Sequence, residues 1–210
     1  MEDTWKDYFN KTFGRPPRPL LVEALTHLNA RDKALDLGAG ALNDSAYLLE
    51  QNFNHVTAVD KVLVATEVAE PFPKNQFEYI ESTFESFSFP TNSFNLINAQ
   101  FALPFILPEE FTRVFIAMKD SLKEGGVLTG QFFGDRDEWK TRPGMTFKTR
   151  IEAEELLQDF KVISFKEEEM DAKTAMGSMK HWHIFHFIVQ KKFKCGHFLT
   201  HFLYTFQDPR

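Results

Sequence analysis

The sequence predicts one α/β domain built on a doubly wound, mostly parallel sheet that is covered by helices on both faces. Three observations support this prediction. Short apolar strands alternate with amphipathic helices through most of the chain. A glycine turn over 38–40 joins the first strand to a helix, as in nucleotide-binding βαβ units. Two strands near the end have no long helix between them, which predicts an antiparallel hairpin at the sheet edge.

The elements of the first half follow from hydrophobic spacing and from chain breakers. Residues 5–13 have amphipathic spacing, and three prolines within 14–19 end that helix. Later helices have apolar side chains at helical spacing, and the strands are short apolar or alternating runs. In order, the sequence predicts helices over 5–13 and 20–28, a strand over 33–37, a helix over 43–53, and strands over 55–60, 77–81 and 94–100.

The second half adds two helices and three strands. A proline followed by two acids opens a helix over 108–122, which suits a helix N-terminus. The other expected elements are a strand over 127–133, a helix over 151–157, and strands over 161–165 and 183–189. We assign residues 1–192 to a single domain in which residues 1–19 supply an N-terminal lid helix. Residues 193–210 form an aromatic-rich C-terminal extension without an assigned role.

Composition limits the classes of partner. The chain has 210 residues and a net charge of −6 with no long basic run, so we expect no nucleic-acid partner. No apolar run reaches the roughly 20 residues of a membrane helix, and the first residues lack the pattern of a signal peptide. The single cysteine, Cys195, cannot form an internal disulfide, and this favours a cytoplasmic protein. The oligomeric state stays open.

Two carboxylates frame the glycine turn and narrow the choice of ligand. Asp36 lies near the end of an apolar strand, two residues before Gly38, and a buried carboxylate needs a partner. It would repel a dinucleotide pyrophosphate, whereas it suits a ligand that carries an ammonium and a sulfonium. Asp60 follows Gly40 by twenty residues at the end of the next strand, where a carboxylate can accept both ribose hydroxyl protons. The pattern therefore favours S-adenosylmethionine as cofactor.

Other residues at the same sheet edge complete the expected cofactor site. Gly38 and Gly40 allow the backbone to come close to a ligand, with Ala39 between them. The segment after the third strand is expected near the adenine, and the amide of Gln100 is expected to point toward the methyl donor. The full set of expected cofactor contacts is Asp36, Gly38, Ala39, Gly40, Asp60, Lys61, Thr83, Phe84 and Gln100.

These motifs resemble those of a known family. Asp-Leu-Gly-x-Gly at 36–40, Val-Thr-Ala-Val-Asp at 56–60 and Phe-Pro-Thr-Asn-Ser-Phe-Asn-Leu-Ile at 89–97 are similar to the class I S-adenosylmethionine-dependent methyltransferases. The leader at 8–11 and the Lys-His-Trp-His at 180–183 resemble the tellurite-resistance methyltransferase branch. The resemblance implies a Rossmann-like, seven-stranded sheet with one antiparallel strand, and it carries Gly38, Gly40 and Asp60 over as cofactor contacts.

The chain departs from the family pattern at two positions of the site. Leu42 stands where many members have another glycine, so we expect a less open loop. Thr83 stands where many have an aspartate for the adenine amine, so we expect that contact to be weaker or to come from the backbone.

The acceptor side offers fewer candidates. Methyl transfer from a sulfonium is an in-line displacement that depends mainly on alignment of the reactants. Arg136, after the fifth strand, is a candidate to bind an anionic acceptor; alternatively, it pairs with a neighbouring aspartate. His181 is a candidate for a general base or for a contact to the acceptor. On a strand His181 and His183 share a face while His186 points away, so we expect no metal site. Trp5, Tyr8 and Phe9 are expected to form the lid.

Three functional hypotheses remain at the level of sequence. The leading one is a methyltransferase that uses S-adenosylmethionine on a small-molecule acceptor. The second is a nicotinamide-dependent Rossmann oxidoreductase, which Asp36 and the lack of a third glycine at Asn43 disfavour. The third is a non-catalytic cofactor-binding protein, which the departures at Leu42 and Thr83 would suit.

Overall fold

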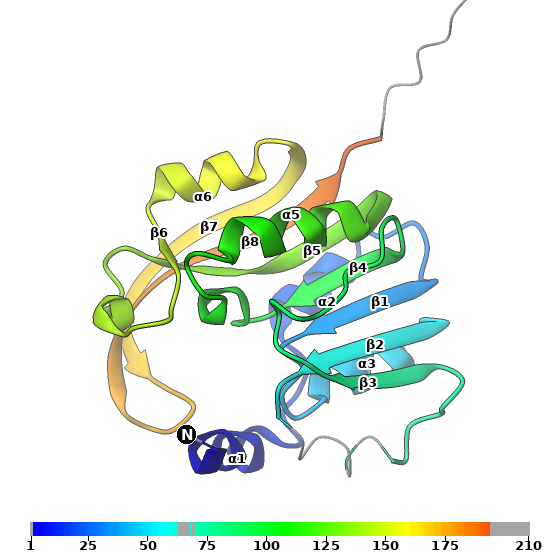
Figure 1. Cartoon of the computed structure of the whole chain (residues 1–210), viewed down its shortest axis with the longest axis horizontal. Helices are drawn as coiled ribbons and strands as arrows, with labels where there is room; N and C mark the ends of the chain where they lie inside the picture. The colour runs from blue at the N-terminus through cyan, green and yellow to red at the C-terminus, as the bar shows by residue number, and fades with distance from the viewer. Residues whose placement is uncertain (1, 63–67, 69, 194–210) are drawn as a thin grey trace, which may run out of the picture.

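A computed structural model describes residues 2–62, 68 and 70–193, with side chains from Asp7 onward. Its strands form an eight-stranded sheet in the order β3-β2-β1-β4-β5-β8-β7, with the short β6 paired to β5 (Figure 1). The strands are β1 (Lys33–Leu37), β2 (His55–Asp60), β3 (Phe77–Glu81), β4 (Phe94–Ala99), β5 (Leu122–Gly134), β6 (Phe147–Lys148), β7 (Phe160–Lys173) and β8 (Met179–Lys191). The helices are α1 (Glu2–Thr12), α2 (Pro19–Leu25), α3 (Asn43–Glu50), η1 (Leu103–Phe105), α5 (Phe111–Ser121), η2 (Glu138–Thr141) and α6 (Arg150–Leu157).

The pairing of the strands confirms the predicted fold class. Strands β3, β2, β1, β4 and β5 pair in parallel, and β8 is antiparallel to both β5 and β7. The strand order reverses between β1 and β4, and such a switch point is where open α/β sheets bind their ligands. The sheet is therefore the expected seven-stranded one with a single reversed strand, extended by β6.

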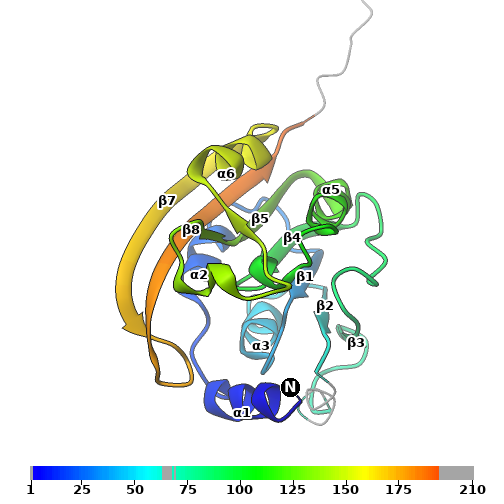
Figure 2. The same ribbon diagram turned by 60° about the vertical axis from the view of Figure 1, so that its left-hand side comes forward.

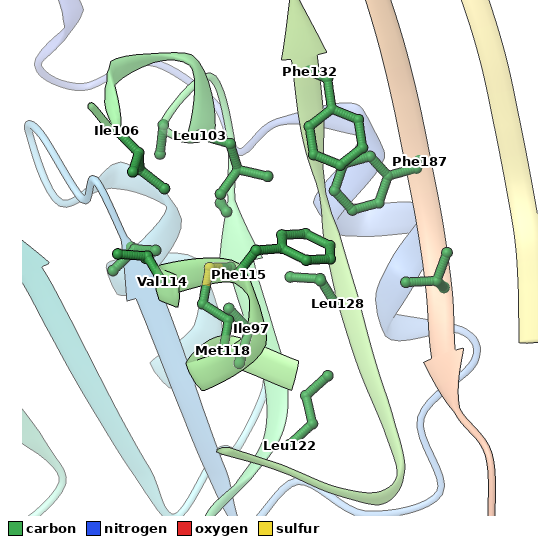
Figure 3. Close-up of a cluster of buried hydrophobic side chains, with 14 of the residues drawn as sticks. Ile97, Leu103, Ile106, Val114, Phe115, Met118, Leu122, Leu128, Phe132 and Phe187 are labelled. Carbon is green, nitrogen blue, oxygen red and sulfur yellow. The ribbon is translucent and has the colours of Figure 1, made fainter. Parts of the chain in front are cut away.

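The two faces of the sheet bury separate apolar clusters. Side chains of α5 pack with alternate residues of β4 and β5 on one face, as Figure 3 shows for Phe115, Leu128 and Phe132. The other face packs against α1, α2 and α3, and Leu21, Leu48 and Phe53 belong to that cluster. Because strand side chains alternate, the residues of β1 divide between the clusters, with Leu35 and Leu37 on the α5 face and Ala34 opposite.

The hairpin of β7 and β8 is much longer than predicted. The sequence indicated strands over 161–165 and 183–189, whereas the structure pairs the two strands from Phe160↔Lys191 to Lys173↔Met179. The distal part is rich in charged and polar residues, whose cross-strand ion pairs replace the apolar alternation that marks a strand. Pairing of β8 with β5 ends at Ile184 and His183 still lies against Gly134, so residues 179–182 project beyond the carboxyl edge of β5. The hairpin tip meets α1, where Lys11 Nζ donates to the Met176 carbonyl at 3.3 Å (Figure 2).

Other differences concern element ends. The helix predicted from Pro108 begins at Phe111, because Glu110 N–H donates to the Leu107 carbonyl and forms a turn before it. The short elements β6, η1 and η2 were not predicted, since two to four residues carry no periodicity.

No helix among the described residues has the length and apolar content needed to span a bilayer. Of the predicted extension, residues 194–210 lie outside the described residues.

Candidate functional site

A row of polar side chains crosses the sheet at the switch point. Asp36 of β1 pairs in register with Asn98 of β4, which pairs with Thr129 of β5. All three are buried, on the sheet face covered by α2 and α3. Of the polar residues at this place, the sequence analysis identified Asp36 and Gln100 and missed those at 98, 129 and 131, which interrupt two apolar strands with period two.

A continuous chain of hydrogen bonds joins this row. Gln131 Nε2 donates to Gln100 Oε1 at 2.8 Å, and Gln100 Nε2 donates to Asn98 Oδ1 at 2.9 Å. Asn98 Nδ2 then donates to Asp36 Oδ1 at 2.9 Å, and the hydroxyl of Ser45 donates to the other oxygen of Asp36 at 2.6 Å. The chain fixes each amide, so Asp36 is held from two sides.

Asp36 is the most perturbed carboxyl of the site. It is 2% exposed. Burial, followed by the nearby charge of Asp44, raises the pKa of Asp36 to about 7, against the opposing effect of hydrogen bonds from Ser45 and Asn98. A cation bound beside Asp36 would lower its pKa and so favour the ionised carboxylate. A carboxyl with a shifted pKa at the switch point of a sheet is typical of a binding site.

The glycine turn leaves space for a ligand. Gly38 has φ +76, and a Cβ there would lie 2.7 Å from Ala102 Cβ, so only glycine fits. Gly40 has φ +50, and a Cβ there would meet nothing closer than 4.0 Å, so its open side is free for a ligand. The N–H groups of Gly38 and Ala39 donate to the Val59 carbonyl, which anchors the turn to β2.

Asp60 supports the turn from β2. Gly40 N–H donates to Asp60 Oδ2 at 2.8 Å, and Val62 N–H donates to Oδ1 at 3.2 Å. Burial raises the pKa of Asp60, while these backbone donors oppose the shift. The carboxylate that was expected to bind a ribose therefore lies directly beside the glycine turn.

The other expected adenine-side residues are placed unequally. Phe84 Cζ lies 3.4 Å from the Cβ position of Gly38, so this ring borders the turn. Lys61 and Thr83 are exposed. The Thr83 hydroxyl is engaged within its own turn, where Ser86 N–H donates to it at 3.3 Å. The structure thus brings Phe84, and not the Thr83 hydroxyl, to the turn.

The chain before α2 is fastened across the turn by the first residues of α3. Asn43 Nδ2 donates to the Thr12 carbonyl at 2.9 Å, and its Oδ1 accepts from Gly14 N–H at 2.9 Å. Asp44 Oδ1 accepts from Arg18 N–H at 3.0 Å, and Asp44 Oδ2 accepts from Asn98. We call residues 8–18 the lead-in. Asn43, which stands where the dinucleotide motif has its third glycine, is therefore the main anchor of the lead-in.

A small cavity of about 30 Å³ lies between the lead-in and the glycine turn. It has an acidic side and a basic side. Its lining comprises Tyr8, Thr12, Arg15, Arg18, Asp36, Gly38, Ala39, Gly40, Asn43, Asp44 and Gln100. The Nε atoms of Arg15 and Arg18 are buried without a hydrogen-bond partner. Burial, and then the charge of Arg15, lowers the pKa of Arg18. Two adjacent guanidinium groups with unused donors indicate a site for an anion.

Two residues without glycine's freedom adopt left-handed backbone at the site. Leu42, before α3, has φ 59, and its side chain is 1% exposed within the core rather than in the cavity. The expectation that Leu42 narrows the loop is therefore wrong. Phe101, after β4, has φ 55, and its N–H donates to Gln131 Oε1 at 2.7 Å. Arg18 Cζ lies 4.6 Å from the centre of the Phe101 ring.

An aromatic cluster surrounds a buried ion pair next to Phe101. It consists of Phe101, Phe133, Trp139 and Trp182, with ring centroids 5.6–6.2 Å apart in each contacting pair. Lys180 Nζ lies 3.5 Å from the Trp182 ring centre and donates to Asp137 Oδ2 at 2.6 Å. The side chains of Lys180 and Asp137 are 1% and 0% exposed. The sequence analysis did not identify this cluster, because its members come from four separate segments.

The structure does not bring Arg136 or His181 to the cavity. Arg136 donates to Glu167 and Glu169 of β7 at 2.7–2.9 Å, so its charge is already paired. His181 contacts Asp171 and Glu169, on the face of β8 opposite to Trp182, which contacts Phe101. Both assignments are corrected here, because neither side chain faces the expected donor.

The histidines alternate as strand geometry predicts. His181 and His183 contact Glu169 and Glu167 on one face, whereas His186 pairs with Glu168 on the other. Among the residues that the structure describes, no group of three or more His, Cys, Asp or Glu side chains is arranged to hold a metal ion.

Comparisons with known proteins agree with this geometry. Residues 35–129 match the family model described as a methyltransferase domain. The fold is similar to that of a SAM-dependent methyltransferase from Methanosarcina mazei (21% identity, 85% of this chain and 100% of that one, TM-score 0.64). It is also similar to TehB from Haemophilus influenzae (18% identity, 90% of this chain and 67% of that one, TM-score 0.72).

A third similar structure holds ligands. It is the 1,6-didemethyltoxoflavin-N1-methyltransferase of Burkholderia thailandensis with bound 1,6-didemethyltoxoflavin and S-adenosylhomocysteine (21% identity, 83% of this chain and 77% of that one, TM-score 0.64). At these identities the likeness to solved structures concerns the fold alone. No curated protein matches the chain significantly.

Proposed function

We propose that this chain, whose residues 35–129 match a methyltransferase domain, uses S-adenosylmethionine to methylate a small-molecule acceptor beside the carboxyl end of β4. The observation that carries the proposal is the two-sided charge of the cavity. Asp36 and Asp44 lie on one side, and the unpartnered Nε atoms of Arg15 and Arg18 lie on the other. A ligand with an ammonium and a carboxylate on one carbon satisfies both sides.

The described residues offer a chemical partner for each part of S-adenosylmethionine. Asp36 would face the ammonium, Arg15 and Arg18 the carboxylate, and the open side of Gly40 the adenosine. Asp60 is placed to accept from ribose hydroxyls, and Phe84 borders the turn for the adenine. These roles extend the sequence-based assignment by the two arginines.

When bound, S-adenosylmethionine supplies a methyl group already activated by its sulfonium, so the protein's task is alignment. The amides of Gln131, Gln100 and Asn98 hold Asp36 in a fixed orientation, so little side-chain freedom is lost on binding. Burial of Asp36 keeps water away from its oxygens and strengthens its attraction for a cation.

The lead-in is proposed to act as a lid over the cofactor. Tyr8 lines the cavity, which supports this proposal, whereas Phe9 packs into the core and the side chain of Trp5 lies outside the described residues. The cavity of about 30 Å³ is far below the roughly 300 Å³ of small-molecule sites, so the lead-in has to move before a cofactor enters.

Calorimetric titration tests the cofactor assignment. We expect S-adenosylhomocysteine to bind the full chain and NAD to show no heat, because the nicotinamide cofactor has no ammonium for Asp36. An Arg15→Ala, Arg18→Ala double variant should weaken binding of S-adenosylhomocysteine at least tenfold, because two charge-assisted contacts are lost. A matched control, Lys140→Ala, removes an exposed cation of η2 and should bind like the wild type. Binding of NAD alone would overturn the proposal.

A further inference from the structure

Arg18 connects the cofactor cavity to the aromatic cluster. Arg18 lines the cavity and its guanidinium also lies over Phe101, the first residue after Gln100. Phe101 keeps its unfavourable left-handed backbone because Gln131 accepts its N–H. Such strain persists where the surrounding structure imposes it, and it often serves a function. Here it turns an aromatic ring toward Trp182, beside the proposed donor site.

The buried ion pair fixes the orientation of both tryptophans. Asp137 Oδ1 accepts from the main-chain N–H of Trp139 at 2.9 Å, its other oxygen accepts from Lys180, and Trp182 Nε1 donates to the Ala172 carbonyl at 3.2 Å. Lys180 in turn lies over Trp139 and Trp182, at 4.3 and 3.5 Å from the ring centres. Phe101, Trp139 and Trp182 are only half-buried, so part of each ring stays at the surface. Rings held in this way lose little freedom when a ligand stacks on them.

The charges around the cluster exclude a cationic ligand. The rings already carry three cations: Arg18 over Phe101, Lys180 over Trp182, and Arg142 at 4.1 Å from the centre of Trp139. Asp137 balances the charge of Lys180, so Arg18 and Arg142 are the groups that repel a further cation here. An aromatic molecule with an anionic or acidic atom matches both the rings and the charges.

We infer that Phe101 and Trp182 form a platform for the methyl acceptor and that the acceptor is a planar aromatic molecule that reacts through an ionisable O–H, S–H or N–H. This inference rests on the proposed function. The acceptor first loses its proton to water. Its anionic atom then bonds to the methyl carbon as the carbon–sulfur bond of the sulfonium breaks, and that electron pair stays on sulfur, giving a neutral methylated product and S-adenosylhomocysteine.

Binding to the S-adenosylhomocysteine-loaded protein provides the first test. Benzoate, cyclohexanecarboxylate and benzylammonium are compared by tryptophan fluorescence and calorimetry. We expect benzoate to bind about tenfold more tightly than cyclohexanecarboxylate, and benzylammonium to be the weakest. The preference should disappear in Trp182→Leu and in Phe101→Leu. It should persist in Phe193→Leu, which removes an exposed ring near Gly125 at the opposite end of the sheet.

Turnover provides the second test. Thiophenol and cyclohexanethiol are compared by production of S-adenosylhomocysteine, and the ratio of their kcat/KM values should fall at least tenfold in each platform variant. Circular dichroism melts check that the variants fold. Equal binding of benzoate and cyclohexanecarboxylate, or an unchanged ratio in both variants, would overturn the inference while leaving a methyltransferase. Lack of S-adenosylhomocysteine binding would instead reject the proposed function itself.

Discussion

Leu42 combines a strained backbone with a well-buried side chain. Its left-handed backbone costs about 1–2 kcal/mol, and its buried side chain contributes about 2–5 kcal/mol. Burial outweighs the strain, so Leu42→Gly should lower the free energy of unfolding by about 1–3 kcal/mol in urea denaturation. Asn52→Gly is the matched control, because Asn52 is left-handed and exposed, and it should change stability by less than about 0.5 kcal/mol. Equal stability of Leu42→Gly and wild type would contradict this account.

Asp36 makes the stability of the cofactor-free protein depend on pH. Its native pKa of about 7 exceeds the unfolded value of about 3.9, so between these values the native state keeps a proton that the unfolded state has lost. Stability therefore falls as pH rises from about 4 to about 7. Asp36→Asn removes this effect. The unfolding free energy of the variant minus that of the wild type should therefore rise by on the order of 2–4 kcal/mol between pH 4 and pH 7.

Urea denaturation at pH 5, 6, 7 and 8 measures this difference. Glu109→Gln, an exposed carboxyl on the turn before α5, serves as the control and should track wild type at every pH. A constant difference between Asp36→Asn and wild type would show that Asp36 does not bind the extra proton.

Residues that sit in a local motif could be predicted, and residues that depend on tertiary placement could not. Asp36, the glycines and Asp60 fall within one βαβ unit, whose spacing is visible in the chain. Arg15 and Arg18 reach the cavity only because Asn43 and Asp44 fasten the lead-in there, and nothing local to the arginines reveals that contact. The pair of Arg136 with a neighbouring aspartate could be predicted, and Arg136 Nη1 lies 3.9 Å from Asp135 Oδ1, whereas its closer partners on β7 lie about thirty residues away.

At the scale of elements, β5 and β8 meet closely at Gly134 and His183, and position 134 has no room for a side chain. A Cβ on Gly134 would lie 1.9 Å from His183 Nδ1, and His183 is fully buried. Gly134→Ala should therefore lower the free energy of unfolding by about 1–3 kcal/mol or more. His183→Ala removes the obstructing ring, so the double variant should lose much less than the sum of the single losses. Additive losses in denaturant melts would contradict this.

The extents of the elements were predictable where apolar periodicity defines them. Strands β1, β2 and β3 have the predicted ends, since their burial pattern follows their sequence. The distal half of the β7–β8 hairpin was missed because polar cross-strand pairs, such as His181 with Glu169 and Asp171, join its strands instead of apolar packing.

At the scale of the whole molecule, the proposed lid predicts that entry of the cofactor requires release of the lead-in. Asn43→Ala removes two hydrogen bonds that hold it, worth about 1–3 kcal/mol together. Amide hydrogen exchange over the lead-in should accelerate about 10–100-fold, and S-adenosylhomocysteine should associate faster in stopped-flow measurements. Ser93→Ala, which removes a local hydrogen bond before β4, should change neither rate. Unchanged exchange in Asn43→Ala would show that the lead-in is held by other contacts.

The overhanging hairpin has a consequence for how newly made protein matures. Most of the proposed donor site comes from the lead-in, β1, α3, β2 and β4, all of which leave the ribosome before residue 101, whereas Gln131, Trp182 and the loop that touches Lys11 emerge later. If the proposed sites are correct, a nascent chain thus exposes most of its donor-binding residues first and gains the proposed acceptor platform only when synthesis is nearly finished.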